Sequence, residues 1–298
     1  VCSSDLLSVA ARSPGAQGGH PCVASSSAAS VHLTDISCMA FHPDWLRRPW
    51  KTPGVSAVMT TRRGGVSAGP YASMNVRDGV GDEPECTARN RALLTEAIGA
   101  APTCLDQVHG LGVARLTARD SAPHAPRHEA DACISTEPGV VCAVQVADCL
   151  PVLFAAPGVV AAAHAGWRGL AAGVLEATLD ALCVAGGCAP DQVEAWLGPC
   201  IGPDCFEVGA DVLSAFGVDP SAPEDVPGRG RAAARFRAVN QGKWLADLPA
   251  LARDRLTSAG VGSISGGSRC TVSDPSRFFS YRRDGVTGRM VAAIWLTG

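Results

Sequence analysis

The chain has 298 residues, of which 47% are hydrophobic and 18% charged, and its formal net charge is −3. This is the composition of an ordinary globular protein, and the near-neutral charge excludes the basic footprint of a protein that binds nucleic acid or an anionic membrane. Apolar runs stay well short of the roughly 18 residues that a membrane-spanning helix needs.

Residues 1–36 are rich in Ser, Ala and Gly and show neither the basic nor the apolar region of a secretory signal. We expect them to form a disordered leader before one domain over residues 37–298. The 13 cysteines are odd in number, and no two of them have CxxC spacing. This pattern indicates free thiols in a reducing compartment, so the expected location is cytoplasmic.

In chain order, a strand is expected over Val55–Thr61, followed by a glycine-rich loop. Pro84–Ile98 fits a helix that ends at Gly99. Further short strands are predicted at Cys104–His109, Val113–Leu116, Ala132–Ser135, Val141–Val146, Val152–Ala155 and Val159–His164. Their close spacing favours a mixed or antiparallel sheet over repeated βαβ units.

The second half of the chain is expected to alternate between helices and strands. Helices are predicted over Leu170–Val184 and Leu245–Ala259, and residues 218–232 read as a surface loop. Strands are predicted at Val193–Leu197, near Ile264, at Phe278–Tyr281 and at Met290–Leu296. The predicted fold class is therefore α/β with layered α+β character, a single domain in which helices flank a mixed β-sheet.

A candidate metal site follows from three residues that lie at the ends of apolar runs. Cys149 precedes one short strand, His164 ends the next, and His109 ends an earlier run. Two imidazoles and one thiolate suit Zn²⁺, and three protein ligands leave a fourth position open, as in catalytic zinc sites. The alternative is that each side chain is simply packed or hydrogen-bonded.

Other chemistries can use the same three residues. A Cys149 thiolate activated by His109 or His164 would be the nucleophile of a hydrolase. Two His and one Cys are also a blue-copper ligand set, and copper can displace zinc from such a site in vitro. Seven histidines in the whole chain are too few for a multicopper oxidase. A binding module without catalysis is a further alternative.

The motifs around these residues resemble a known family. Gln107–Gly110 (QVHG), Ala147–Pro151 (ADCLP) and Ala163–Gly169 (AHAGWRG) are similar to the three signatures of the YfiH/LACC1 family, which includes YlmD and is also called DUF152. Matching segments also include TTR at 60–62, SMN at 73–75, GPCIGP at 198–203 and FSYRRDG at 279–285. The resemblance extends from Val55 to Leu296 in the order of the family.

The resemblance implies a CNF1/YfiH-like α/β domain that holds zinc with His109, Cys149 and His164. Members of the family, once called multicopper polyphenol oxidases, are described as purine nucleoside phosphorylases. They use phosphate to cleave adenosine, inosine, guanosine and methylthioadenosine, and they also deaminate adenosine. The expected partners are therefore nucleosides and phosphate. Bacterial members are also described as peptidoglycan-editing factors that act on mis-loaded UDP-muramoyl precursors, which is the alternative function.

Several other residues in these motifs are candidates for substrate contact. Asp148 is either a proton carrier, a carboxylate that orients a ligand imidazole, or a turn residue. Asn75 is either a partner of a ribose hydroxyl or a turn residue. Candidates for gripping phosphate are Arg62, Arg168 and Arg282, and Arg63 leaves open which member of the Arg62–Arg63 pair acts. Trp167 and Tyr281 are candidates for stacking on a purine.

Overall fold

The central strands of the protein carry Val, Leu, Ile and Ala at nearly every position, so both of their faces must be covered by other layers. Four of them are buried along their whole length: β5 (Val141–Val146), β6 (Leu150–Ala156), β7 (Val159–Ala165) and β13 (Met290–Leu296). The computed structural model describes residues 41–122, 125–222, 230–240 and 242–298. The leader predicted for residues 1–36 lies outside the described residues.

The strands form three sheets. The six-stranded sheet has the order β12 (Ser263–Gly266), β8 (Glu194–Leu197), β6, β7, β4 (Ala132–Ser135) and β3 (Val113–Arg115). The four-stranded sheet has the order β1 (Val55–Met59), β13, β5 and β2 (Pro102–Thr103). A small antiparallel sheet joins β10 (Phe236–Asn240), β11 (Lys243–Ala246) and β9 (Glu207–Val208). The predicted mixed α/β class is confirmed, with several sheets where one was expected.

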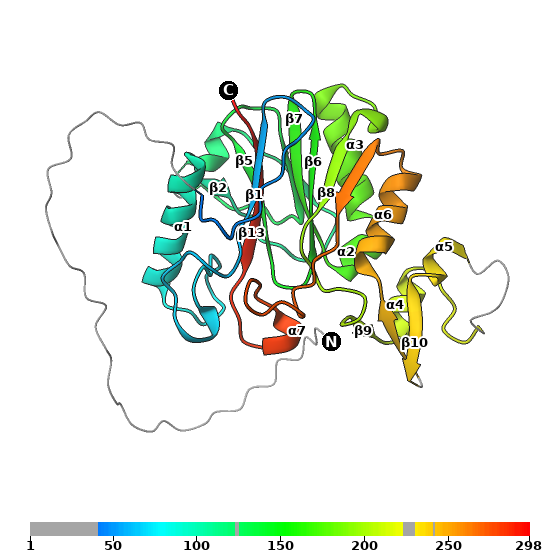
Figure 1. Cartoon of the computed structure of the whole chain (residues 1–298). Helices are drawn as coiled ribbons and strands as arrows, with labels where there is room; N and C mark the ends of the chain where they lie inside the picture. Colours follow the sequence, from blue (N-terminus) through cyan, green and yellow to red (C-terminus); the bar gives the residue numbers. More distant parts are fainter. Residues whose placement is uncertain (1–40, 123–124, 223–229, 241) are drawn as a thin grey trace, which may run out of the picture. The chain divides into compact units, whose positions relative to one another are not determined.

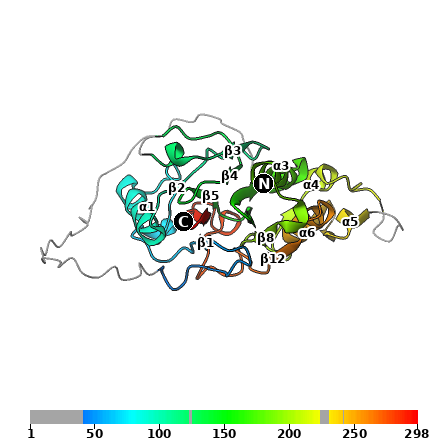
Figure 2. The ribbon, with the colours of Figure 1, turned by 90° about the horizontal axis from the view of Figure 1, so that it is seen from above.

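Within the unit Met39–Gly298, the two large sheets face each other and helices cover their outer faces (Figures 1 and 2). Met59, Val144 and Leu153 belong to the core between the sheets. Leu94 of α1 (Pro84–Ile98) packs with the outer face of the four-stranded sheet. The six-stranded sheet packs against α3 (Val174–Gly186) and α6 (Leu248–Ser258). In the described part of the chain, no helix is both long and apolar enough to cross a bilayer.

The predicted helix over Pro84–Ile98 is confirmed residue for residue, but the other two predicted helices begin or break differently. Gly173 has a left-handed φ of 107° and divides the predicted helix Leu170–Val184 into α2 (Trp167–Ala172) and α3. The predicted helix Leu245–Ala259 starts too early, because its first residues belong to β11. Asp247 caps α6 by accepting a hydrogen bond from the Ala250 N–H at 2.9 Å.

Two predicted strands are wrong, because buried apolar residues there lie on irregular backbone. Leu105 within Cys104–His109, and Phe278 and Phe279 within Phe278–Tyr281, all reach the core between the sheets without forming strands. Residues 223–229 of the predicted loop lie outside the described residues. Three short helices were not predicted from the sequence: α4 (Ala210–Ala215), α5 (Gly230–Ala233) and α7 (Tyr281–Asp284).

The β6–β7 hairpin brings the ends of two strands together. The strands are antiparallel with Leu150 opposite Ala165 and Pro151 opposite His164, and the turn between them uses Gly158 with a φ of 73°. Cys149, just before β6, therefore emerges at the same sheet edge as His164. The neighbouring pair β4–β7 has Ala132 opposite Ala163, which sets the residue before β4 beside His164.

Candidate metal and active site

The structure brings the three predicted ligands together. The donor atoms of His109, Cys149 and His164 all lie within 4.8 Å of one another, and His109 Nε2 is 3.8 Å from Cys149 Sγ. The two imidazole rings meet edge to face, with centroids 4.8 Å apart and an interplanar angle of 70°. His164 is buried at the end of β7 whereas His109 is exposed, so the cluster opens to solvent on the His109 side. This arrangement can hold one metal ion and leave a position for another ligand.

Asp131 fixes the orientation of His164. Its fully buried carboxylate lies at the start of β4, and its Oδ1 is 2.8 Å from His164 Nδ1. The main chains of the two residues are also joined, because the His164 N–H donates to the Asp131 carbonyl oxygen at 2.7 Å. When the imidazole is neutral, an Nδ1–H donated to Asp131 leaves the Nε2 lone pair of His164 available to a metal. The sequence analysis did not identify Asp131, although it lies one residue before a predicted strand.

The same carboxylate also holds the loop that carries His109. Its oxygens accept hydrogen bonds from three consecutive N–H groups, those of Val108 at 3.1 Å, His109 at 3.0 Å and Gly110 at 2.6 Å. His109 has a left-handed φ of 61°, which a residue with a side chain adopts at a cost and which curls these N–H groups around one anion. Asp131 therefore positions two of the three candidate ligands.

Gly166 has no side chain, and this absence makes room for the cluster. A Cβ at this position would lie 2.7 Å from His109 Cδ2 and 3.2 Å from Cys149 Sγ. Any larger residue would therefore push His109 away from Cys149. Three features therefore fit a mononuclear zinc site: the imidazole and thiolate donors, the opening toward solvent, and the absence of a side chain at Gly166.

The charges of the cluster favour an ionised thiol. Burial alone would raise the pKa of Cys149, but the charge of His164 and hydrogen bonds from His109 and His164 lower this pKa to about 6. Burial would likewise lower the pKa of His164, but the Cys149 charge and the hydrogen bond to Asp131 raise it to about 9. Burial also opposes ionisation of Asp131, and its hydrogen bonds with His164 and the Gly110 N–H hold its pKa below the ordinary value. A thiolate is the form that binds a metal.

Asp148 lies beside the cluster but does not orient an imidazole. Its backbone is left-handed, with a φ of 89°. One carboxylate oxygen accepts from Thr271 Oγ1 at 2.5 Å, and the other accepts from the Arg282 N–H at 2.6 Å. Asp148 thus joins the strand end that carries Cys149 to the segment that begins α7. One role predicted for Asp148 was to orient a ligand imidazole. Asp131 makes that contact instead.

The three predicted phosphate-binding arginines have different surroundings. Arg168 is exposed at the start of α2 and stacks on Trp167, with its guanidinium carbon 4.4 Å from the ring centroid. The guanidinium of Arg282 donates to the Glu207 carbonyl oxygen at 3.0 Å. Arg62 donates to the carbonyl oxygens of Ala72 and Pro275, each at 2.9 Å, and so holds two loops together. Arg168 and Arg282 are both exposed, but of the three only Arg168, within the described part of the chain, leaves its guanidinium without a hydrogen bond to another residue.

Asn75 lies in the interior and supports another cation, Arg289. The Asn75 side chain is fully buried, and its Oδ1 accepts from the N–H groups of Arg77 at 3.2 Å and Arg289 at 2.8 Å. Its amide NH₂ donates to the Arg77 carbonyl and to Asp82. These contacts disfavour direct contact with a ribose. The pKa of Arg289 is lowered by burial and by the charge of Arg77, although the charges of Cys149 and Asp148 act in the opposite direction.

Arg289 is thus a partly buried cation whose charge interacts with those of Cys149 and Asp148, and it was not among the candidates from the sequence. Its guanidinium faces the ring of Tyr281, with 5.7 Å between the guanidinium carbon and the ring centroid. Tyr281 is itself 45% exposed and so is accessible to a planar ligand. Gln107, in the first motif, is bonded on both sides to the main chain of Gln145, which ties the His109 loop to β5.

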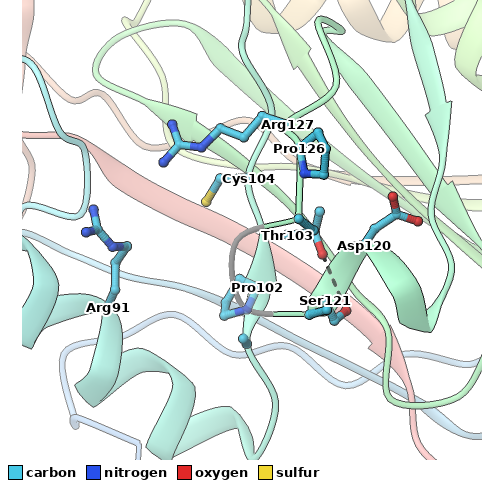
Figure 3. Close-up of a pocket in the computed structure, with 11 residues that line it drawn as sticks. Arg91, Pro102, Thr103, Cys104, Asp120, Ser121, Pro126 and Arg127 are labelled. Atoms are coloured by element: carbon cyan, nitrogen blue, oxygen red, sulfur yellow. Dashed lines mark hydrogen bonds between the residues drawn. The ribbon is translucent and has the colours of Figure 1, made fainter.

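A separate hollow of about 250 Å³ contains none of the predicted site residues (Figure 3). Arg91 and Arg127 flank Cys104 on its wall in this view. Both arginines are paired with the carboxylate of Asp78, at 2.7 and 3.5 Å. The positive charges of both arginines are already balanced by a carboxylate, so we do not assign a phosphate site to this hollow.

The fold and the cluster define the class: a mixed α/β protein with a candidate mononuclear metal site at one edge of its larger sheet. The family model described as multi-copper polyphenol oxidoreductase laccase matches residues 56–297. The chain therefore belongs to this family, which includes the proteins named YfiH and YlmD.

Named relatives match over nearly their whole length. The purine nucleoside phosphorylase YfiH of Escherichia coli is 49% identical, with 83% of this chain and 96% of that protein aligned. A purine nucleoside phosphorylase of Pseudomonas aeruginosa is 46% identical, with 85% of this chain and 98% of that protein aligned. A crystal structure of a Neisseria meningitidis protein of the DUF152 family superposes with a TM-score of 0.76 at 44% identity, covering 86% of this chain and all of that one.

Proposed function

We propose that this protein is a zinc-dependent purine nucleoside phosphorylase whose catalytic domain spans residues 37–298. It would cleave adenosine, inosine, guanosine and methylthioadenosine with phosphate, giving the free base and ribose 1-phosphate, and would also deaminate adenosine. The observation that carries the proposal is the His109–Cys149–His164 cluster in a chain whose relatives at 46% and 49% identity are named purine nucleoside phosphorylases.

The surroundings of the cluster support this assignment. Zinc at these three ligands would supply a Lewis acid beside the substrate. Phosphorolysis brings an anionic nucleophile to a sugar carbon that develops positive charge, so the site needs cations to hold phosphate and a planar surface for the base. Arg168 is the accessible cation, Arg289 adds a positive charge beside Cys149, and Tyr281 offers an exposed ring.

A proton must also reach the leaving purine. Asp148 is the carboxylate next to Cys149, and its oxygens already accept from Thr271 Oγ1 and the Arg282 N–H. We propose that it fixes the Cys149 turn and, after taking up a proton, acts as the proton carrier. Asp131 would keep its charge throughout, because its hydrogen bonds all favour the ionised form.

The test is a product analysis of metal-loaded protein. Adenosine is incubated with and without phosphate, and the products are separated by chromatography. The proposal requires adenine and ribose 1-phosphate only when phosphate is present, and inosine in either case. Metal analysis of protein purified without added metal is the companion measurement, with about one zinc per chain expected if three ligands hold it. No turnover of any of the four nucleosides by the zinc-loaded protein would refute the assignment.

A Cys149-based hydrolase, such as a peptidoglycan-editing factor acting on mis-loaded UDP-muramoyl precursors, is the second candidate. The observation that favours it is the low pKa of Cys149, about 6, with His109 Nε2 3.8 Å from its sulfur. The Cys149→Ala variant separates the two functions. Loss of activity together with zinc supports the phosphorylase, whereas loss of activity with zinc fully retained supports a nucleophilic thiol.

A further inference from the structure

Two half-buried cysteines, Cys205 and Cys270, lie on two segments that are joined by a parallel β-bridge. Cys200 pairs with Cys270 in a parallel bridge. The Thr271 N–H donates to the Cys200 carbonyl at 2.9 Å, and the Cys200 N–H donates to the Arg269 carbonyl at 3.3 Å. These backbone hydrogen bonds hold residues 200–205 against residues 269–273.

The sulfur of Cys270 lies among backbone N–H groups. The Gly202 N–H donates to Cys270 Sγ at 3.2 Å, and hydrogen bonding by Ser273, Gly202 and Val272 lowers the pKa of this thiol against the effect of burial. The close approach depends on Gly202 having no side chain, since a Cβ there would lie 2.9 Å from Cys270 Cβ. Several N–H donors around one sulfur stabilise a thiolate.

Cys205 reaches the same place from the opposite segment. Its N–H closes a turn on the Gly202 carbonyl at 3.0 Å, and its Sγ lies 3.4 Å from Ser273 Oγ. Ser273 also lowers the pKa of Cys270, and the interaction with Cys270 raises the pKa of Cys205, so the two thiols influence each other. A sulfur that can become a thiolate therefore lies next to a second sulfur that can attack it.

A second thiol pair in the chain provides the contrast. Cys183 and Cys188 also interact, at the end of α3, but burial and the neighbouring Cys188 raise the pKa of Cys183 to about 11. For Cys270, burial acts in the same direction, yet hydrogen bonds from Ser273, Gly202 and Val272 lower its pKa. Of these two pairs, the one that includes Cys270 has the more reactive sulfur.

We propose that Cys205 and Cys270 form a redox-active dithiol that exchanges with low-molecular-weight disulfides such as oxidised glutathione. The Cys270 thiolate attacks one sulfur of glutathione disulfide, the S–S bond breaks, and one glutathione thiolate leaves. Cys205 then gives up its proton and its sulfur attacks Cys270 of the mixed disulfide, which expels the second glutathione. The two protein thiols are oxidised to one disulfide, and one glutathione disulfide is reduced to two thiols.

This disulfide would lock the segments next to the candidate active site. Thr271, adjacent to Cys270, donates to Asp148. Phe206, adjacent to Cys205, lies under the Arg282 guanidinium at 5.5 Å. The oxidised bond would thus covalently join the two segments that hold Asp148 and Arg282 beside Cys149.

The experiment reads the thiols directly and needs no nucleoside turnover, so its result is independent of the proposed function. Protein comprising residues 1–298 is equilibrated in the presence of zinc with mixtures of reduced and oxidised glutathione, quenched by acid and alkylation, and mapped by peptide mass spectrometry. The expected result is a Cys205–Cys270 disulfide at glutathione ratios that leave Cys183 and Cys188 alkylated. The double variant Cys183→Ser/Cys188→Ser should form the same disulfide at the same ratio.

Single variants test the order of the two steps. Cys205→Ser should accumulate glutathione on Cys270, because the resolving thiol is gone. Cys270→Ser should leave Cys205 alkylated under the same conditions. The proposal is overturned if Cys205 and Cys270 both stay reduced at ratios that oxidise Cys183 and Cys188, or if glutathione is trapped on Cys205 rather than Cys270.

Discussion

The Oδ1 atom of Asp131 lies 2.8 Å from Nδ1 of His164, and both side chains are buried at the edge of the six-stranded sheet. The same carboxylate accepts hydrogen bonds from the backbone N–H groups of Val108, His109 and Gly110. One buried anion therefore positions two imidazoles that are 55 residues apart in the printed sequence. The geometry of the cluster therefore depends on a residue that is not itself one of the three candidate ligands.

Asp131→Asn should weaken zinc binding by roughly 10–100-fold, the usual cost of losing a carboxylate behind a metal-bound His. The side-chain amide of Asn would also point its own N–H group at backbone N–H groups that need an acceptor. The free energy of unfolding should therefore fall by about 3 kcal/mol. Zinc affinity is measured by competition with a chromophoric chelator and stability by urea denaturation.

The matched control for this variant is Asp120→Asn. Asp120 also accepts from a backbone N–H, that of Thr117, and from an imidazole, that of His128, but it lies outside the cluster. Its replacement should leave zinc affinity unchanged. Equal losses of zinc affinity in both variants would show that Asp131 acts only through general stability.

Gly166→Ala should disrupt the cluster by steric contact alone. Its Cβ would meet His109 Cδ2 at 2.7 Å, so His109 must move away from Cys149, and zinc affinity should fall at least about tenfold as one ligand is misplaced. Gly110→Ala is the control in the His109 loop, because its Cβ would make only ordinary contacts, at 3.5 Å or more. Zinc titration of the two variants under identical conditions is the measurement, and normal affinity in Gly166→Ala would show that the ligands can rearrange around a methyl group.

Much of the scaffold is predictable from the sequence because its strands and α1 carry continuous apolar runs or clear end residues. The β6–β7 hairpin shows this best: two runs and a Pro-Gly turn are enough to predict that Cys149 and His164 emerge at one edge. The conformation of the His109 loop cannot be predicted in this way. Its left-handed backbone depends on a carboxylate 22 residues later, and no local pattern links them.

The incorrect strand predictions have a common physical cause. Leu105, Phe278 and Phe279 are as deeply buried as strand residues, yet their backbones are irregular. Burial alone therefore does not distinguish a strand from a loop that inserts side chains into the core. Arg289 was missed for another reason: its charge interacts with Cys149 only in the folded chain, and a single arginine before an apolar strand is common in any sequence.

The Cys149 thiol of metal-free protein should react as a thiolate at unusually low pH. With its pKa lowered to about 6, alkylation by iodoacetamide should show half of its plateau rate near pH 6 and should decline below that pH as the thiol is protonated. Cys183, with a pKa raised to about 11, is the internal control and should stay largely unreacted at pH 7. Zinc should protect Cys149 at pH 7, and this protection should weaken on acidification as protons compete for the thiolate and imidazoles. The rate is followed by mass spectrometry of the Cys149 peptide, and a midpoint near pH 9 would contradict the charge arrangement of the cluster.

Arg168 and Arg62 should respond differently to the same replacement. Arg168 is exposed and its guanidinium lies on Trp167, so Arg168→Gln should raise the KM for phosphate about tenfold or more, equivalent to about 1.4 kcal/mol, with little change in the urea midpoint. Arg62 bonds to two carbonyl oxygens, so Arg62→Gln should lower the free energy of unfolding by about 1–3 kcal/mol. The measurements are phosphate-dependent initial rates with inosine and urea denaturation of both variants. The opposite result would be an unchanged phosphate KM in Arg168→Gln and a raised phosphate KM in correctly folded Arg62→Gln. It would indicate that Arg62, rather than Arg168, binds phosphate.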